Sequence, residues 1–209
     1  MSRERITLEN KSTEERIKEA AARVFVKKGF AATKTRDIAE EAGINIASLH
    51  YYYRSKERLF EIIIGEALRK FSGGMDHILG GDEPVHKKIR TFVHSYIDFF
   101  RENPYVPMFI ISESQNNPDK VDKMLDGQKS INKLRKQLEE LAEKGVIRPV
   151  HHAHFFMNLI SLTAFPFIGK PVMMRKVNLS SAAYDKLLEE RKEMIPEMIM
   201  SYFYLKRPE

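Results

Sequence analysis

The sequence predicts an all-α protein with two helical domains. Apolar residues in the 209-residue chain recur mainly at helical spacing, and no segment alternates cleanly between apolar and polar residues as a half-buried strand does. Short segments punctuated by glycine come first, and longer amphipathic segments follow from residue 84. We expect an N-terminal three-helix domain over residues 1–55 and a helical domain over residues 56–209, with about nine helices in all.

The composition is that of a globular chain, with 43% hydrophobic and 31% charged residues. The absence of cysteine excludes disulfides, thiolate zinc sites and a cysteine nucleophile. No apolar stretch reaches the roughly 18–20 residues of a membrane span, and Met1–Asn10 lacks the apolar core of a signal peptide. We therefore expect a cytoplasmic protein without membrane association. Lysine and arginine (35) exceed aspartate and glutamate (29), mostly within residues 1–60, which permits a phosphate-rich partner.

The first segments carry recognisable signals for helix starts and stops. Ser12 and Glu15 have the spacing of a capping box, and the amphipathic helix behind them is expected to end at Gly29. Thr35 is expected to cap a second, short helix that ends before Gly43.

Two further caps follow closely along the chain. Asn45 is expected to cap a short helix ending near Tyr53, and Ser55 to cap a fourth helix that fades at Gly73 and Gly74. Two short helices joined by a glycine turn, behind a first helix, have the order of a helix-turn-helix. In that motif the second of the two helices lays its N-terminal residues in the major groove of DNA.

The remaining segments are longer and more strongly amphipathic. Residues 84–102 form one predicted helix, and the Asn-Pro pairs at 103–104 and 117–118 are each expected to end a helix and start the next. Residues 118–144 form a long, highly charged stretch that ends at Gly145.

Two predicted helices close the chain. Residues 154–168 are apolar on nearly every side, so this helix is expected to be buried on more than one side. Residues 182–206 form the last helix, which Pro196 is expected to bend.

Residues 13–60 resemble the DNA-binding region of the tetracycline-repressor (TetR) family. The resemblance is carried above all by T-R-D-I-A-E-E-A-G-I at 35–44 and S-L-H-Y-Y-Y-R-S-K-E-R-L-F at 48–60. The remaining chain resembles the ligand-binding and dimerising region of that family in length and layout. The resemblance implies a homodimeric repressor that binds a near-palindromic, double-stranded operator, is released by a small hydrophobic effector and needs no cofactor.

The resemblance also assigns DNA contacts by position. Phosphate contacts are implied for Thr35, Tyr51 and Lys56. Base reading is implied for the exposed face of the second motif helix, which carries Ile46, Ala47, Ser48, His50 and Tyr52. The family commonly reads Leu-Tyr-Tyr-His-Phe where this chain has Leu49-His50-Tyr51-Tyr52-Tyr53, which leaves the base sequence open.

The aromatic residues of the second region are candidates for an effector cavity between helices. These candidates are Tyr96, Phe99, Phe109, Phe155, Phe156 and Phe165. Core packing and dimer contact explain the same residues equally well, so two alternatives remain. One is a constitutive regulator without an effector, and the other is a helical ligand-binding protein that does not bind DNA.

Catalysis and metal binding find little support in the sequence. The chain contains no glycine-rich phosphate loop, no H-E-x-x-H and no G-x-S-x-G, so we do not expect an enzyme. His151, His152 and His154 are neighbours that do not converge within one helix, so we expect no metal site there. A site completed by His94 from another helix is the alternative that the sequence leaves open.

Overall fold

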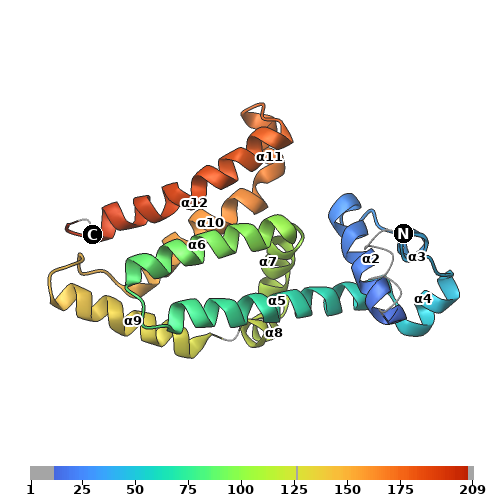
Figure 1. Ribbon diagram of the computed structural model, residues 1–209, viewed down its shortest axis with the longest axis horizontal. Coiled ribbons are helices and arrows are strands. Elements are labelled where there is room, and N and C mark those ends of the chain that lie inside the picture. The colour runs from blue at the N-terminus through green and yellow to red at the C-terminus, as the bar shows by residue number, and fades with distance from the viewer. Residues whose placement is uncertain (1–11, 126, 207–209) are drawn as a thin grey trace, which may run out of the picture. The chain divides into compact units, whose positions relative to one another are not determined.

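The computed structural model describes residues 12–125 and 127–206, and the chain within them is helical without strands (Figure 1). The eleven helices are α2 (Thr13–Lys28), α3 (Thr35–Ala42), α4 (Ile46–Tyr52), α5 (Lys56–Gly80), α6 (Val85–Glu102), α7 (Val106–Asn116), α8 (Pro118–Met124), α9 (Gln128–Glu143), α10 (His152–Ile168), α11 (Lys170–Lys176) and α12 (Ser181–Phe203). The all-α prediction is confirmed, although the described residues form eleven helices rather than about nine.

The chain divides into two compact units, residues 1–68 and 69–209. Helix α5 contributes its first half to one unit and its second half to the other. The functional boundary expected between residues 55 and 56 stays a prediction. No single described helix is long and apolar enough to cross a membrane; α10 and α11 pass such a test together by length and composition alone, with a 70° bend between them.

Three predicted caps are present in the first unit. The Ser12 hydroxyl accepts the Glu15 N–H at 3.2 Å while the Glu15 carboxylate accepts the Ser12 N–H at 3.0 Å, which completes the capping box of α2. The Asn45 side chain accepts the Ser48 N–H at 2.7 Å at the start of α4. The Ser55 hydroxyl accepts a backbone N–H at 3.1 Å in the first turn of α5.

The cap of α3 differs from the prediction. Thr35 is the first helical residue, and Lys34, with extended backbone (φ −104°, ψ 153°), occupies the N-cap position. The Asp37 carboxylate accepts the Lys34 N–H at 2.9 Å. The acidic side chain in the first turn therefore satisfies the N–H of the N-cap residue Lys34, and Thr35 is not the cap.

Helix α5 does not fade at Gly73 and Gly74 but continues to Gly80. Glycine inside a helix costs roughly 1 kcal/mol relative to alanine, which is small against the burial of large side chains on the same helix. Phe71 stacks on Phe99 of α6 with ring centroids 4.3 Å apart, and Leu79 is buried. Tertiary packing thus outweighs local propensity here.

The second Asn-Pro pair ends α7 and starts α8 at Pro118, as predicted. The first pair ends α6 but does not start the next helix, since α7 begins at Val106. The charged stretch over 118–144 is not one long helix, since it divides into α8 and α9. Gly127 precedes α9 with non-helical backbone (φ −163°, ψ 9°), so the division follows from a residue that weakly supports helix.

Helix α10 is buried on one side only, which corrects the expectation from its apolar sequence. Phe155 and Leu159 are buried, whereas Met157, Ile160 and Phe165 are 41–56% exposed. The described helices that pack against α10 are chiefly α6, α7 and α12. They leave a strongly apolar face of α10 uncovered within one copy of the chain.

Two side chains of α12 hold the C-terminal half of α10. Pro166 has no N–H, so the carbonyl of Leu162 loses its usual helical donor. Arg191 replaces that donor, with Nη2 2.7 Å from the Leu162 oxygen, and its Nε has no hydrogen-bond partner. The Tyr184 hydroxyl donates to the Pro166 carbonyl at 2.6 Å. Pro196 lies inside α12, which continues past it, and the bend expected there stays a prediction.

Candidate functional site

The turn between α3 and α4 depends on Gly43. Its backbone is left-handed (φ 66°, ψ 37°), a conformation that costs little only for glycine. Its N–H bonds back to carbonyls of α3, and the Ile44 N–H donates to the Ala39 carbonyl at 3.0 Å. Arg16 of α2 braces the same end of α3, because its Nη2 donates to the Ala42 carbonyl at 2.9 Å. The direction of α4 is therefore set by the backbone turn and by a side chain from α2.

Ion pairs also join α2 to α3. Lys28 lies 2.8 Å from the Asp37 carboxylate, and Arg23 lies 2.7 Å from Glu41. The Lys28 ammonium, together with the Lys34 N–H, holds the pKa of Asp37 below its ordinary value. These pairs are solvent-exposed, so each stabilises the fold only modestly, while together they restrict how α3 lies on α2.

Helix α4 presents two contrasting faces. Leu49 and Tyr53 are 2% and 4% exposed and point into the first unit. The Tyr53 hydroxyl donates to the Glu14 carboxylate of α2 at 3.2 Å, and burial, followed by the charge of Glu14, raises the pKa of Tyr53. These anchors allow the opposite face of α4 to remain in solvent without loosening the helix.

The five predicted base-reading residues and Tyr51, the predicted phosphate contact, lie away from these anchors. Ser48 is half-buried, and the others are exposed: Ile46, Ala47, His50, Tyr51 and Tyr52. Tyr51 is 84% exposed, and its ring meets Tyr52 edge to face with centroids 5.4 Å apart. The structure thus brings the six together on one short helix, with hydroxyl, imidazole and apolar groups side by side.

Lys56 is more deeply engaged than the sequence suggests. Its ammonium donates to the carbonyls of Phe30 and Thr33, both at 3.0 Å, and lies 4.3 Å from the centroid of the Phe30 ring. Two of its three N–H donors are therefore used to hold the loop before α3, and one remains. Thr35 is half-buried in the first turn of α3, two residues beyond this loop.

A cavity of about 800 Å³ lies among α6, α7 and α10 in the second unit. Three of the six predicted residues line it, namely Tyr96, Phe156 and Phe165. The other three do not. Phe99 stacks on Phe71, Phe155 is buried against Phe203 (centroids 5.3 Å apart), and Phe109 lies 5.7 Å from the ammonium of Lys120.

Sequence reasoning missed much of the cavity wall. Phe100 of α6 and three residues of α7, Pro107, Ile110 and Ile111, also line it. The two Asn-Pro pairs bracket α7, but its apolar residues show little periodicity, so their direction was not predictable. The sequence therefore indicated where this helix lies in the chain, but not which of its faces lines the cavity.

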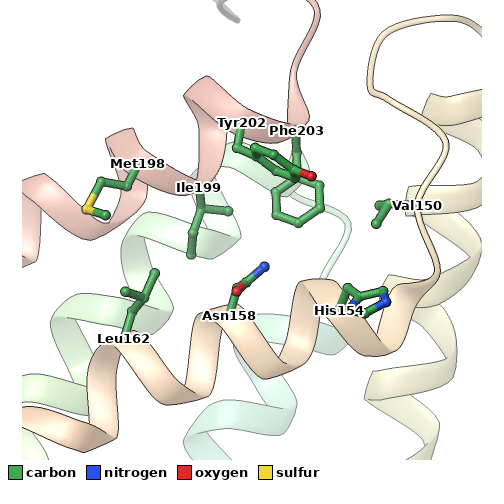
Figure 2. Close-up of a pocket in the computed structure, with 8 residues that line it drawn as sticks. All are labelled: Val150, His154, Asn158, Leu162, Met198, Ile199, Tyr202 and Phe203. Carbon is green, nitrogen blue, oxygen red and sulfur yellow. The ribbon is translucent and has the colours of Figure 1, made fainter.

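A second concave surface runs between α10 and α12 (Figure 2). His154, Asn158 and Leu162 on α10 face Met198, Ile199 and Tyr202 on α12, around a groove of about 520 Å³. Met198 and Tyr202 belong to a row of exposed apolar residues on α12 that also includes Leu187 and Met194. Successive members of this row are seven, four and four positions apart. Within the described residues, no group of three or more His, Cys, Asp or Glu side chains is arranged to hold a metal ion.

Two family profiles match the chain in its two regions. "Bacterial regulatory proteins, tetR family" matches residues 17–63, and "Tetracyclin repressor-like, C-terminal domain" matches residues 84–199, more than half of the sequence. The chain belongs to the TetR family. The N-terminal match contains all eight residues to which we assign DNA contacts, and the C-terminal match contains the cavity.

HTH-type transcriptional regulators are found among its sequence relatives. The Bacillus subtilis (strain 168) protein named "Probable HTH-type transcriptional regulator YttP" is 23% identical over 161 residues, which cover 75% of this chain and 78% of that protein. The HTH-type transcriptional repressor KstR2 of Mycolicibacterium smegmatis is 33% identical over 86 residues, 41% of this chain and 42% of that one. The chain is therefore a DNA-binding transcriptional regulator and not an enzyme.

Solved structures show the same fold. A TetR/AcrR-family regulator from Thermobifida fusca YX-ER1 superposes with a TM-score of 0.62 at 16% identity, over 88% of this chain and 96% of that one. The TetR-family regulator PfmR from Thermus thermophilus gives a TM-score of 0.58 at 23% identity, over 91% and 99%. At these identities the likeness concerns the TetR fold alone.

Proposed function

We propose that this TetR-family regulator is a homodimeric repressor that binds a near-palindromic operator through α4 and leaves it when a small hydrophobic effector binds. The observation that best supports DNA binding through α4 is that one side of this helix is anchored in the first unit while the other side is exposed. Leu49 and Tyr53 fix the helix, while His50, Tyr51 and Tyr52 remain exposed. The repressor role is supported by the partial sequence likeness to KstR2, which is itself named a repressor.

The chemistry of the exposed face assigns a role to each side chain. Ile46 and Ala47 offer only apolar contact, suited to thymine methyl groups, and the Ser48 hydroxyl is both donor and acceptor. His50 Nδ1 lies 3.4 Å from the Arg54 carbonyl; a proton on Nδ1 would leave Nε2 as an acceptor for a base amino group. Tyr52 extends base reading from the same face.

Phosphate contacts are assigned to the residues beside this face. The Tyr51 hydroxyl is free to reach a phosphate because its side chain is 84% exposed. Lys56 retains one N–H donor, and Thr35 lies in the first turn of α3, where backbone amides favour anions. These contacts fix the position of α4 on the duplex without selecting a sequence.

Dimerisation is supported by the groove between α10 and α12 and by the uncovered apolar residues of α12. We assign the pairing of two copies to these two helices, around a two-fold axis, because the exposed apolar side chains along the groove would then be removed from water, whereas Met157, Ile160 and Phe165 of α10 lie at the rim of the separate cavity. Two copies related in this way would read two half-sites about 34–36 Å apart, one turn of the duplex.

Effector response is supported by contacts between the cavity wall and α5. Tyr96, which lines the cavity, meets the Phe71 ring of α5 edge to face with centroids 5.3 Å apart. A ligand that moves Tyr96 therefore acts on the helix whose first half belongs to the DNA-binding unit. If the ligand and DNA favour different positions of α5, each must weaken the binding of the other by the same factor.

Selection of bound sequences from random duplex DNA tests the proposal. The wild-type protein should recover one near-palindrome, with an affinity that falls steeply with salt, by about 0.9 log units per phosphate contact for each tenfold rise. Ser48→Ala and Tyr52→Ala should change the recovered sequence. Tyr51→Phe, the matched control, should weaken binding to all sequences alike. Sequence-blind binding by the wild-type protein, or equal effects of the three variants, would contradict the assignment.

A further inference from the structure

We propose that the cavity among α6, α7 and α10 takes an uncharged, mainly apolar molecule with one hydrogen-bond acceptor, and that this acceptor meets the hydroxyl of Tyr96. The inference deepens the proposed function, because it names the chemical class of the effector. It rests on three observations: the apolar composition of the cavity wall, the ion pairs made by neighbouring cations, and the hydroxyl of Tyr96 on the wall.

The wall of the cavity carries no charged side chain. Its most deeply buried members are Tyr96 and Phe100 of α6 and Pro107 of α7. Its other residues are apolar except Asn158 and Ser161, which are exposed, and the Ser161 hydroxyl lies 3.4 Å from the Asn158 carbonyl. The polar groups Asn158 and Ser161 therefore lie at the open side of the cavity, and the deeper wall of Tyr96, Phe100 and Pro107 is mainly hydrocarbon and aromatic.

Three cations on the helices beside the cavity are already paired with acids. Arg101 bonds to Glu189, Lys170 lies 3.2 Å from Asp185, and Lys192 lies 2.6 Å from Asp98. A carboxylate or sulfonate in the cavity would thus lose its water without gaining a counter-charge, which disfavours its binding. An ammonium group would meet the same penalty, since no carboxylate lines the cavity.

Tyr96 supplies the specific contact. It is 7% exposed, and no hydrogen bond joins its hydroxyl to another group of the described chain. Burial raises the pKa of Tyr96, so the hydroxyl stays protonated and acts as a donor at neutral pH. A donor on the cavity wall that has no partner within the described chain favours a ligand that brings an acceptor, such as a ketone, ester or ether oxygen.

The depth of the cavity favours a small molecule over a second copy of the chain. The exposed side chains at the rim, Met157, Ile160 and Phe165, could be covered by another helix. Tyr96 and Phe100 lie behind that rim, and a volume of about 800 Å³ is within the usual range of ligand sites, about 300–1,000 Å³.

Two fluorescent probes with one skeleton test the charge requirement on the full-length protein. N-phenyl-1-naphthylamine is neutral, and 8-anilino-1-naphthalenesulfonate adds only a sulfonate. We expect saturable binding of the neutral probe, at least about ten-fold tighter than that of the sulfonate. Ala164→Phe, which fills the cavity, should abolish the neutral signal, whereas Ala182→Phe, at an exposed position of α12, should leave it unchanged.

Three results would overturn the inference. The first is equal affinity for the two probes, with both signals lost in Ala164→Phe. The second is a neutral signal that is missing in the wild-type protein or insensitive to Ala164→Phe. The third is a fall in mass from dimer to monomer on sedimentation of Ala164→Phe, because the cavity would then be part of a contact between copies.

A neutral ketone probe tests the hydroxyl. The dye 6-propionyl-2-(dimethylamino)naphthalene carries a carbonyl acceptor, and its emission shifts to longer wavelength when that carbonyl accepts a hydrogen bond. Tyr96→Phe should weaken its binding about three- to ten-fold and shift its bound emission to shorter wavelength. Tyr105→Phe, outside the cavity lining, is the matched control. Unchanged binding and emission in Tyr96→Phe would remove Tyr96 from the site.

Operator release, measured in parallel, separates the two proposals. If the neutral probes bind in the cavity and the operator complex persists, the inference stands and the proposed effector response fails. If metabolites release the operator while neither neutral probe occupies the cavity, the inference fails and the response stands.

Discussion

Lys56 combines observed contacts within the first unit with a proposed contact to DNA. Its ammonium closes the loop between α2 and α3 through the carbonyls of Phe30 and Thr33, and one donor remains for DNA. Loss of the side chain therefore removes a structural contact before any DNA is present. A DNA-binding defect in a Lys56 variant cannot be assigned to a phosphate contact until stability has been measured.

Lys56→Ala should lower the free energy of unfolding by about 2 kcal/mol, because two hydrogen bonds from a charged donor and a cation–π contact are lost. Urea unfolding followed by circular dichroism at 222 nm measures this change. Lys27→Ala, an exposed lysine of α2, is the matched control and should change stability little. An unaltered unfolding curve for Lys56→Ala would show that the loop is held by other contacts.

Asp37 makes the folding stability of the first unit depend on pH in the acidic range. Its pKa is lowered in the folded chain by the Lys28 ammonium and the Lys34 N–H. Its contribution is therefore complete above the unfolded-state pKa, about 3.9, and is lost as the pH falls through the lower folded value. Asp37→Asn should be less stable than wild type near neutral pH and should lose less stability on acidification. Parallel acid unfolding curves would contradict this sign.

At the scale of helices, a side chain of α12 donates the hydrogen bond that a backbone N–H of α10 would otherwise make. Pro166 removes the N–H that the Leu162 carbonyl would use, and Arg191 supplies another from α12. Because the guanidinium is half-buried and burial lowers its pKa, the contact is made against a desolvation cost. The two residues should therefore be energetically coupled although they lie on different helices.

A double-mutant cycle measures that coupling. Arg191→Leu alone should destabilise the protein by about 1–3 kcal/mol, because it leaves a carbonyl unsatisfied. In a Pro166→Ala background, where residue 166 again donates to Leu162, the same change should cost less, with a coupling of about 1 kcal/mol. Additive effects in thermal unfolding would mean that the Arg191 hydrogen bond does not compensate for the donor that Pro166 lacks.

Helix ends were predictable where one nearby side chain decides them. Ser12, Asn45 and Ser55 cap their helices as the sequence predicts, since each contact joins residues three positions apart. The end of α5 was not predictable from Gly73 and Gly74, because the packing of Phe71 on Phe99 comes from another helix. Local chemistry fixes caps, whereas tertiary contacts decide how far a helix continues.

At the scale of the whole molecule, the exposed apolar residues of α12 are those we assign to pairing. Met198→Glu should shift the protein from dimer to monomer in sedimentation and weaken operator binding at least about ten-fold, since both half-sites must be held together. Lys136→Glu, on the exposed part of α9, is the matched control. A variant that remains dimeric and binds the operator normally would exclude this face from the interface.

The candidate sites were predictable to different degrees. The proposed reading residues of α4 were predictable because they lie within one local motif of seven residues. The structure leaves Ser48 half-buried and exposes the others. The cavity needs three helices that are distant in sequence, so aromatic content alone identified Tyr96, Phe156 and Phe165 and also three residues that lie elsewhere. A cavity is a property of packing, and composition does not specify it.

The donor exchange between Pro166 and Arg191 has a consequence for sequence divergence. The proline of α10 removes the donor of one carbonyl, and the arginine of α12 supplies another. We therefore expect substitutions at the two positions to depend on each other. In an alignment of close relatives, residues with a backbone N–H at position 166 should coincide with relaxed constraint at position 191. The pair would then appear as covariation between two sites that share no side chain-to-side chain hydrogen bond.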